Sequence, residues 1–308
     1  MSLSLCLIGI VFGSLLGSGH AKGHYYDEYS DRLARNMVVV AAGAYAQDPM
    51  QCLNKVYPMD QYKLRSHMVT ACDGDSNTCG VYTAVSAKDQ RIIVAFRGTV
   101  GDKQMKLEMV ESLKPSIDWY SYGLIDRYFY NAIDKMWPYV EGAINETSSS
   151  HFEIKLLTFG EPRVGNAVYA ANVDRVVKDV YRVVHKADVV PHLPPCKDSR
   201  TDRRACDAGD LRRMYHHGTE VWYNNDMGPG ADYKLCTRSD EDADCSDGLG
   251  KWEGKDHLNY FGHDIGAFGG ATYYKRTQVT GPRILSNVLP LMGGYDEIGG
   301  KKRRETWE

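Results

Sequence analysis

The stretch that decides the fold is YRVVHKADVVPHLPP at residues 181–195, an apolar run that leads into an aspartate and then into a proline-rich turn. Asp188 stands where a buried parallel strand would end. In open α/β sheets the functional side chains gather at the carboxyl ends of strands, and prolines fix the backbone that follows. Asp188 is therefore a candidate for chemistry, although an aspartate here can also be an ordinary turn residue.

A later segment strengthens the chemical interpretation of Asp188. DHLNYFG at residues 256–262 supplies His257, and Asp followed by His is the chain order in one type of hydrolytic triad. The third member of that triad should be a serine upstream of both.

Length and composition favour a single domain. The chain has 308 residues, of which 43% are hydrophobic, so it can bury one large core. The net charge of -3 and the pI near 6.4 leave no basic stripe, which argues against nucleic acid as a partner. No segment after residue 21 is apolar enough to span a membrane.

The amino-terminal residues predict secretion. LSLCLIGIVFGSLL at residues 3–16 is a short apolar run, and Gly19 and Ala21 fit the -3 and -1 positions of a cleavage site. We expect a signal peptide at residues 1–21 and an extracellular protein; because the run has no preceding Lys or Arg, a buried amino-terminal helix is the alternative. Asn145, in Asn-Glu-Thr, is a predicted glycosylation acceptor.

Seven cysteines would remain after cleavage, and cysteines outside the cell should pair. Short spacings suggest three disulfides, although spacing does not prove connectivity. Cys52 would be left without a partner. The suggested pairs are Cys72 with Cys79, Cys196 with Cys206, and Cys236 with Cys245.

Two metal sites were weighed against this disulfide pattern. Zinc would need Cys196 and Cys206 with His216 and His217, but adjacent histidines on a strand point to opposite faces. The acidic loop with Asp242, Asp244, Ser246 and Glu253 resembles a calcium loop, yet Asp247 stands where the sharp turn requires glycine. We therefore expect no metal and no cofactor.

The remaining pattern predicts an α/β protein with a mostly parallel sheet. Alternating strands and helices after residue 152 imply parallel pairing through crossovers, and a hairpin is expected at 216–236. Expected helices lie at 29–46, 103–113 and 123–144, the last kinked or interrupted before Pro138; expected strands lie at 66–74, 79–87, 91–99, 152–160 and 179–186.

Four ordered blocks give the chain a family resemblance. It resembles the secreted class 3 lipases, the fungal-type triacylglycerol lipases of the α/β-hydrolase fold, over about residues 30–265. The predicted domain is accordingly 22–265, followed by a Gly-rich, poorly packed tail at 266–308. The blocks are IIVAFRGT at 92–99, LLTFGEPRVGN at 156–166, YRVVHKADVVPHLPP at 181–195 and DHLNYFG at 256–262.

The resemblance implies roles for individual residues. Asp188 would be the triad acid, His257 the general base, and the backbone N–H of Thr99 an oxyanion-hole donor. It also implies a lipid or another ester of triacylglycerol type as substrate, with transient contact at a lipid interface. Residues 103–113 would then form a lid, although their apolar stripe fits a core-facing helix equally well.

The nucleophile of this machinery is missing. No G-x-S-x-G occurs in the chain, and Ile144 is followed by only seven residues before Phe152, where the family places a strand, the serine elbow and a helix. That unit would take about 25–30 residues. No other serine is placed to act as the nucleophile. Serines 148–150 precede the strand at 152–160, so they lie about 20 Å from the sheet edge where Asp188 lies. Ser76 lacks the glycine two residues after it that the motif requires, and we interpret it as a turn residue.

Two hypotheses about function follow. The first is a carboxylic-ester hydrolase of the triacylglycerol lipase type, which describes the ancestry well but lacks its serine. The second is a non-catalytic secreted relative that binds lipid or protein. Because loss of the serine leaves only weak residual rate in such triads, we expect this chain to be inactive. Loss of a central strand should also make its neighbours pair anew or expose their edges.

Overall fold

The structure is a computed structural model that describes residues 8–15, 29–59, 61–112, 114–119, 121–145, 152–196 and 206–264. The chain divides into a unit of residues 1–274 and a second unit of residues 275–308. The second unit, the whole of the predicted tail at 266–308 and the predicted cleavage site at Ala21 lie outside the described residues.

The centre of the fold is a mixed sheet of eight described strands in the order β12-β11-β9-β7-β1-β4-β3-β2. The strands β7, β9 and β11 are mutually parallel, as the alternating pattern predicted, and β11 forms the predicted hairpin with β12. The strands are β1 (Ile8–Leu15), β2 (Lys63–Ala71), β3 (Thr78–Ser86), β4 (Arg91–Phe96), β7 (Phe152–Phe159), β9 (Asp179–His185), β11 (Thr219–Tyr223) and β12 (Lys234–Cys236).

Two small sheets lie beside the main one. The four-stranded sheet has the order β10-β8-β6-β5, and β13 pairs with β14. Their strands are β5 (Ile117–Asp118), β6 (Leu124–Ile125), β8 (Gly165–Asn166), β10 (Met214–Tyr215), β13 (Asn259–Tyr260) and β14 (His263–Asp264).

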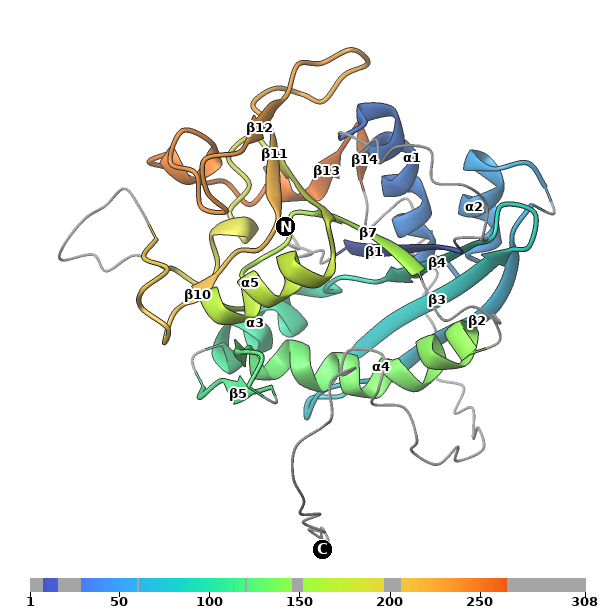
Figure 1. Cartoon of the computed structure of the whole chain (residues 1–308), viewed down its shortest axis with the longest axis horizontal. Helices are drawn as coiled ribbons and strands as arrows, with labels where there is room; N and C mark the ends of the chain where they lie inside the picture. Colours follow the sequence, from blue (N-terminus) through green and yellow to red (C-terminus); the bar gives the residue numbers. More distant parts are fainter. Residues whose placement is uncertain are drawn as a thin grey trace, which may run out of the picture. The chain divides into compact units, whose positions relative to one another are not determined.

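Helices cover both faces of the main sheet, with α1 and α4 on opposite sides (Figure 1). Met37 of α1 belongs to one apolar cluster with Ile93 and Phe159, and Met136 of α4 belongs to a second with Val94. The helices are α1 (Asp31–Ala42), α2 (Met50–Val56), α3 (Gly101–Glu111), α4 (Arg127–Asn145) and α5 (Ala167–Val176), with short 3-10 turns at Gly43–Tyr45, Val190–His192, Ser246–Gly248 and Asp256–Leu258.

Local sequence explains where two of these helices begin. The Ser30 hydroxyl accepts a hydrogen bond from the backbone N–H of Leu33 at the start of α1, and Asn166 caps α5 through the N–H of Tyr169. Of the two alternatives for the long helix, a kink or an interruption before Pro138, the interruption is wrong, because α4 continues through this residue to Asn145. Amphipathic packing of α4 against the sheet outweighs the one backbone hydrogen bond that proline removes.

The strand β1 lies between β4 and β7, and in the sequence these two strands flank the point at which the family resemblance would place a nucleophile strand. It is antiparallel to both neighbours, and it comes from the apolar run predicted as the core of a signal peptide. Both β4 and β7 pair with β1 and expose no edge to each other. This arrangement corresponds to new pairing, one of the two outcomes expected if a central strand is lost. The alternative of an amino-terminal helix is wrong for residues 8–15, and cleavage after Ala21 stays a prediction.

The three predicted disulfides are formed, and among the described cysteines Cys52 is free and buried. Burial raises the pKa of the Cys52 thiol.

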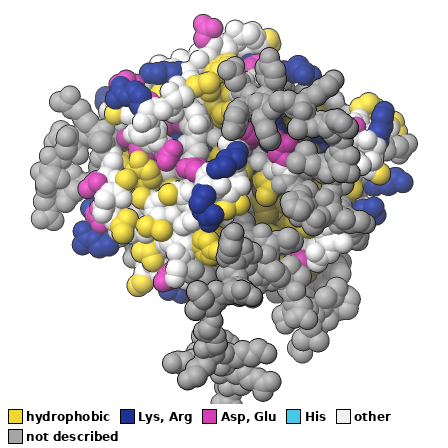
Figure 2. All heavy atoms as spheres, in the orientation of Figure 1, with side chains coloured by type: hydrophobic (Ala, Val, Ile, Leu, Met, Phe, Trp, Pro, Cys, Tyr) yellow, Lys and Arg dark blue, Asp and Glu magenta, His cyan; other side chains and the backbone are white. Residues whose placement is uncertain are grey.

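On the face drawn in Figure 2, basic and acidic side chains are intermixed. Within the described part of the chain, no helix has the length and apolar character that crossing a bilayer requires. The predicted acceptor Asn145 is exposed at the end of α4.

Candidate active site

Asp188 lies three residues beyond β9, at the carboxyl edge of the parallel strands. Its side chain is fully buried, and its carboxylate is held by three donors. The Oδ1 atom accepts the backbone N–H of Val190 at 2.9 Å, and Oδ2 lies 2.8 Å from Nδ1 of His257 and 2.5 Å from the hydroxyl of Tyr260. These bonds fix the carboxylate toward the histidine.

His257 comes from a short 3-10 turn that follows the acidic loop, and only 2% of its surface is exposed. A carboxylate at Nδ1 sets the orientation of the imidazole and stabilises the cation that forms when the ring takes a proton. Asp188 and His257, which were expected to lie close together, are in contact although 69 residues separate them in the sequence. Their catalytic roles remain a prediction.

Gly160 and Tyr260 are contacts that sequence reasoning missed. Gly160 follows β7 with φ of +63°, and a Cβ there would lie 2.7 Å from His257 and 2.8 Å from the Asp188 carboxylate. The position therefore requires glycine both for its backbone and for space. The signal was present, because both residues fall inside the blocks LLTFGEPRVGN and DHLNYFG that carry the resemblance.

Thr99 follows β4, and β4 runs in the same direction as β7 because each is antiparallel to β1. Its side chain is buried and its hydroxyl donates to the carboxyl of Glu108, whose oxygens lie 2.5 and 2.6 Å away. Thr99 is thus placed at the same edge of the sheet as Asp188. Whether its backbone N–H serves an oxyanion stays a prediction.

The helix α3 packs through polar side chains, in contrast to the predicted apolar stripe. Gln104 accepts the N–H of Val100 and donates to the Tyr128 hydroxyl of α4, and Glu108 contacts Thr99. Met109 is 49% exposed, so of the two alternatives for this helix, a lid or a core-facing helix, the core-facing one does not hold for this residue. Burial raises the pKa of Glu108 to about 8, which keeps the carboxyl protonated and able to share a hydrogen bond with Thr99.

A second buried pair lies next to Gly160. Nε2 of His217 is 3.2 Å from the Glu161 carboxylate, and both side chains are buried. Burial opposes both charges, yet the mutual attraction raises the pKa of His217 and lowers the pKa of Glu161. His216 points elsewhere, toward the carbonyl of Pro191, and burial lowers its pKa well below the usual value. The two histidines therefore do not share a site, as expected for neighbours in an extended segment.

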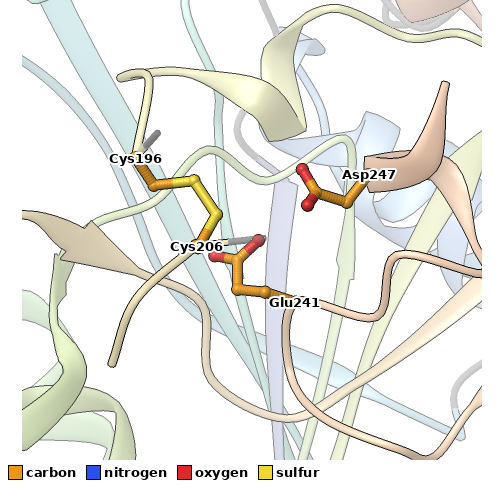
Figure 3. A group of neighbouring side chains, drawn as sticks. All are labelled: Cys196, Cys206, Glu241 and Asp247. Atoms are coloured by element: carbon orange, nitrogen blue, oxygen red, sulfur yellow. A yellow bond between two sulfur atoms is a disulfide. The ribbon is translucent and has the colours of Figure 1, made fainter. Parts of the chain in front are cut away.

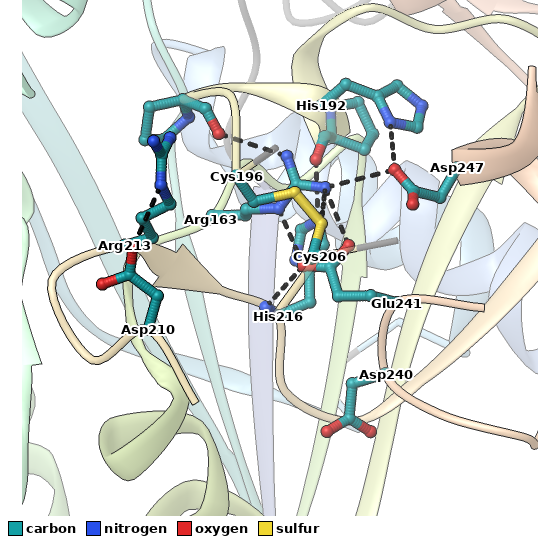
Figure 4. Close-up of a disulfide and its surroundings, with 12 residues drawn as sticks. Arg163, His192, Cys196, Cys206, Asp210, Arg213, His216, Asp240, Glu241 and Asp247 are labelled. Carbon is teal, nitrogen blue, oxygen red and sulfur yellow. Dashed lines mark hydrogen bonds and ion pairs between the residues drawn. A yellow bond between two sulfur atoms is a disulfide. The ribbon is translucent and has the colours of Figure 1, made fainter. Parts of the chain in front are cut away.

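One cluster has the composition of a metal site. The carboxylates of Glu241 and Asp247 lie beside Cys196 and Cys206, but the two sulfurs form a disulfide (Figure 3). Arg163 stands between these groups: its guanidinium contacts both oxygens of Glu241 at 2.7 Å and Asp247 at 3.4 Å (Figure 4).

That guanidinium supplies the positive charge that a metal ion would bring, and disulfide sulfurs are not thiolate ligands. Although burial opposes its charge, the two carboxylates raise the pKa of Arg163. Among the described residues the other candidate group, Glu220 with Cys236 and Cys245, also contains a disulfide. Both groups are structural clusters.

The comparisons with known proteins agree with this geometry. The class 3 lipase family matches residues 143–198. Lipase ZK262.3 of Caenorhabditis elegans is 33% identical over an alignment of 352 residues that covers 98% of this chain and 96% of the relative. This alignment is longer than the 308 residues of the chain, so the relative has residues where this chain has none.

Fungal lipases are similar to part of this sequence and share its fold. A lipase of Rhizomucor miehei is 32% identical over 122 residues, which cover 39% of this chain and 29% of the relative. The structure of lipase II from Rhizopus niveus superposes with a TM-score of 0.59 at 19% identity, covering 77% of this chain and 96% of that one. The lipase from Rhizopus microsporus var. chinensis gives a TM-score of 0.58 at 19% identity, covering 83% and 96%. The chain therefore belongs to the class 3 lipase family and has its α/β-hydrolase fold.

Proposed function

We propose that this protein is a secreted lipase-like hydrolase relative that retains the acid and base of a Ser-His-Asp triad and does not hydrolyse esters. The observation that carries the proposal is the direction of β1. A nucleophile elbow needs a strand that ends at the edge where Asp188 and His257 lie. The strand in that place runs the opposite way, so its amino end, Ile8, pairs beside Phe159 at this edge.

The histidine alone supplies a base without a nucleophile. An ester carbonyl requires attack by an activated hydroxyl, and the Asp188–His257 pair can orient and accept a proton but forms no acyl intermediate. Secretion and glycosylation at Asn145 belong to the same proposal, which the three disulfides and the exposure of Asn145 support.

The direct test is hydrolysis of a triacylglycerol emulsion and of a soluble short-chain ester by the purified chain. A fungal class 3 lipase serves as positive control, and His257→Ala defines the background. We expect the chain and His257→Ala to give the same rate. A rate that exceeds the background and is lost on His257→Ala would show that another group in the chain acts as the nucleophile.

A second function, binding of a lipid surface, is favoured by exposed apolar side chains on and beside α3. Val100, Met109 and Val110 are 48%, 49% and 54% exposed on and beside this helix, where the packed side is polar. Exposed apolar groups gathered on one short element are typical of an interaction site. Leu211 is equally exposed, at 48%, but lies elsewhere in the chain.

Vesicle sedimentation tests the binding function. Replacing Val100, Met109 and Val110 with serine should weaken binding to triolein-containing phosphatidylcholine vesicles by about 150-fold, since each apolar side chain that is partly buried in the lipid contributes about 1 kcal/mol. Leu211→Ser should leave binding unchanged. Equal effects of the two sets of substitutions would remove α3 as the contact surface.

A further inference from the structure

The strand β1 differs from its surroundings in direction and origin. β4 and β7 run in the same direction, because each pairs antiparallel with β1. Strands joined through helical crossovers keep the direction of their parallel neighbours, and β1 does not. It therefore enters the sheet as an inserted segment from the amino-terminal part of the chain.

The space between β4 and β7 has the dimensions of one extended segment. β1 pairs with β7 from Ile8 opposite Phe159 to Leu15 opposite Phe152, and with β4 over residues 10–14. Neighbouring strands lie about 4.8 Å apart, so β4 and β7 are separated by about 10 Å. Without an occupant, both would present rows of unpaired backbone N–H and C=O groups in the middle of the sheet, which is costly.

The side chains of β4 and β7 that flank this space are apolar and buried, so an apolar segment fits between the two strands. On one face of the sheet, Ile93 and Leu157 are buried in the cluster that includes residues of α1, and α1 itself contacts β1. On the other face, Ile92 and Val94 are buried in the cluster that includes residues of α4. The sequence of β1, IGIVFGSL, has no charge and no proline, as a strand enclosed on both faces requires.

We propose that the gap between β4 and β7 is a binding site for an extended apolar peptide, and that residues 8–15 are its resident ligand. The strand is held by backbone pairing between two neighbours whose side chains are apolar on both faces, and its covalent link to the rest of the chain is not what keeps it there. If residues 1–21 are cleaved as the sequence predicts, the cut segment stays bound as the central strand.

Cleavage of the folded chain tests this site. A specific protease sequence placed within residues 16–28 of the full chain is cut after purification, and gel filtration with mass spectrometry follows both products. We expect the amino-terminal fragment to co-elute with the remainder in a 1:1 ratio. Val11→Pro should release it, because proline removes a pairing N–H, whereas Val11→Ala should retain it. Separation of the unsubstituted fragment, whether or not the remainder stays folded, would overturn the proposal.

A crosslink provides a second measurement that does not depend on cleavage. Gly9 is the register partner of Thr158, so Gly9→Cys with Thr158→Cys should form a disulfide within one chain, identified by peptide mapping. Gly9→Cys with Leu157→Cys is one residue out of register and serves as the matched control. No crosslink, equal crosslinking of the control, or a crosslinked dimer in which a second copy donates the strand would contradict the assignment.

Discussion

Replacing Gly160 with alanine should break the contact between Asp188 and His257. The new Cβ would lie 2.7 Å from Cε1 and Nδ1 of the His257 ring and 2.8 Å from Oδ2 of Asp188. Carbon atoms normally pack at about 3.5–4.0 Å, so the ring or the carboxylate must move. Neither can yield easily, because both side chains are almost fully buried and the Tyr260 hydroxyl also donates to Oδ2 of Asp188.

The cost has two parts. A residue other than glycine at the φ of +63° costs about 1–2 kcal/mol. Displacement of the histidine removes a hydrogen bond to a charged group, which contributes about 1.5–3 kcal/mol. We therefore expect Gly160→Ala to lower the free energy of unfolding by about 3–5 kcal/mol.

Urea denaturation measures this loss, and Gly74→Ala is the matched control. No atom lies within 4 Å of a Cβ at Gly74, which lies in the turn between β2 and β3, so its substitution should change the free energy of unfolding by less than about 0.5 kcal/mol. A loss at Gly160 no larger than the loss at Gly74 would refute the packing that we describe around the pair.

Three further predictions concern the rest of the described fold. Because burial raises the pKa of Glu108 to about 8, the folded chain binds a proton that the unfolded chain releases, and stability should fall by about 1 kcal/mol per pH unit from pH 5 to 8; Glu108→Gln should flatten this slope in urea titrations. Arg163→Met leaves the Glu241 and Asp247 carboxylates buried without their cation and should lower the unfolding free energy by about 3–5 kcal/mol. Thiol titration of the full chain carrying Cys6→Ser should find one thiol, Cys52, which reacts only after denaturation; a count of zero would show that it has a partner.

The sequence predicted the candidate site better than it predicted the sheet. The sequence predicted the contact between Asp188 and His257 for two reasons. Each residue lies in a block whose strand or turn places its side chain at the carboxyl edge of the sheet, and the order Asp then His is the order of one type of triad. The role of β1 could not be predicted, because a short apolar run fits a signal peptide, a buried helix or a buried strand equally well.

The spacing of apolar residues also could not predict which side of α3 packs against the rest of the fold. Its methionine spacing favoured an apolar contact face, but the groups it meets, Thr99 and Tyr128, offer hydrogen bonds, and Gln104 and Glu108 pack there instead. Hydrophobic periodicity shows which side chains of a helix are apolar, but it does not show which groups of the fold they will contact. Only the folded chain shows that Thr99 and Glu108 are in contact.

The most direct measurement of the central claim is labelling with a fluorophosphonate probe, which reacts with a serine hydroxyl only when a neighbouring base activates it. A chain that retains Asp188 and His257 but has no nucleophile elbow should remain unlabelled under conditions in which a fungal class 3 lipase is labelled completely. Labelling of this chain that disappears on His257→Ala would contradict the account, because it would show an activated serine beside the histidine.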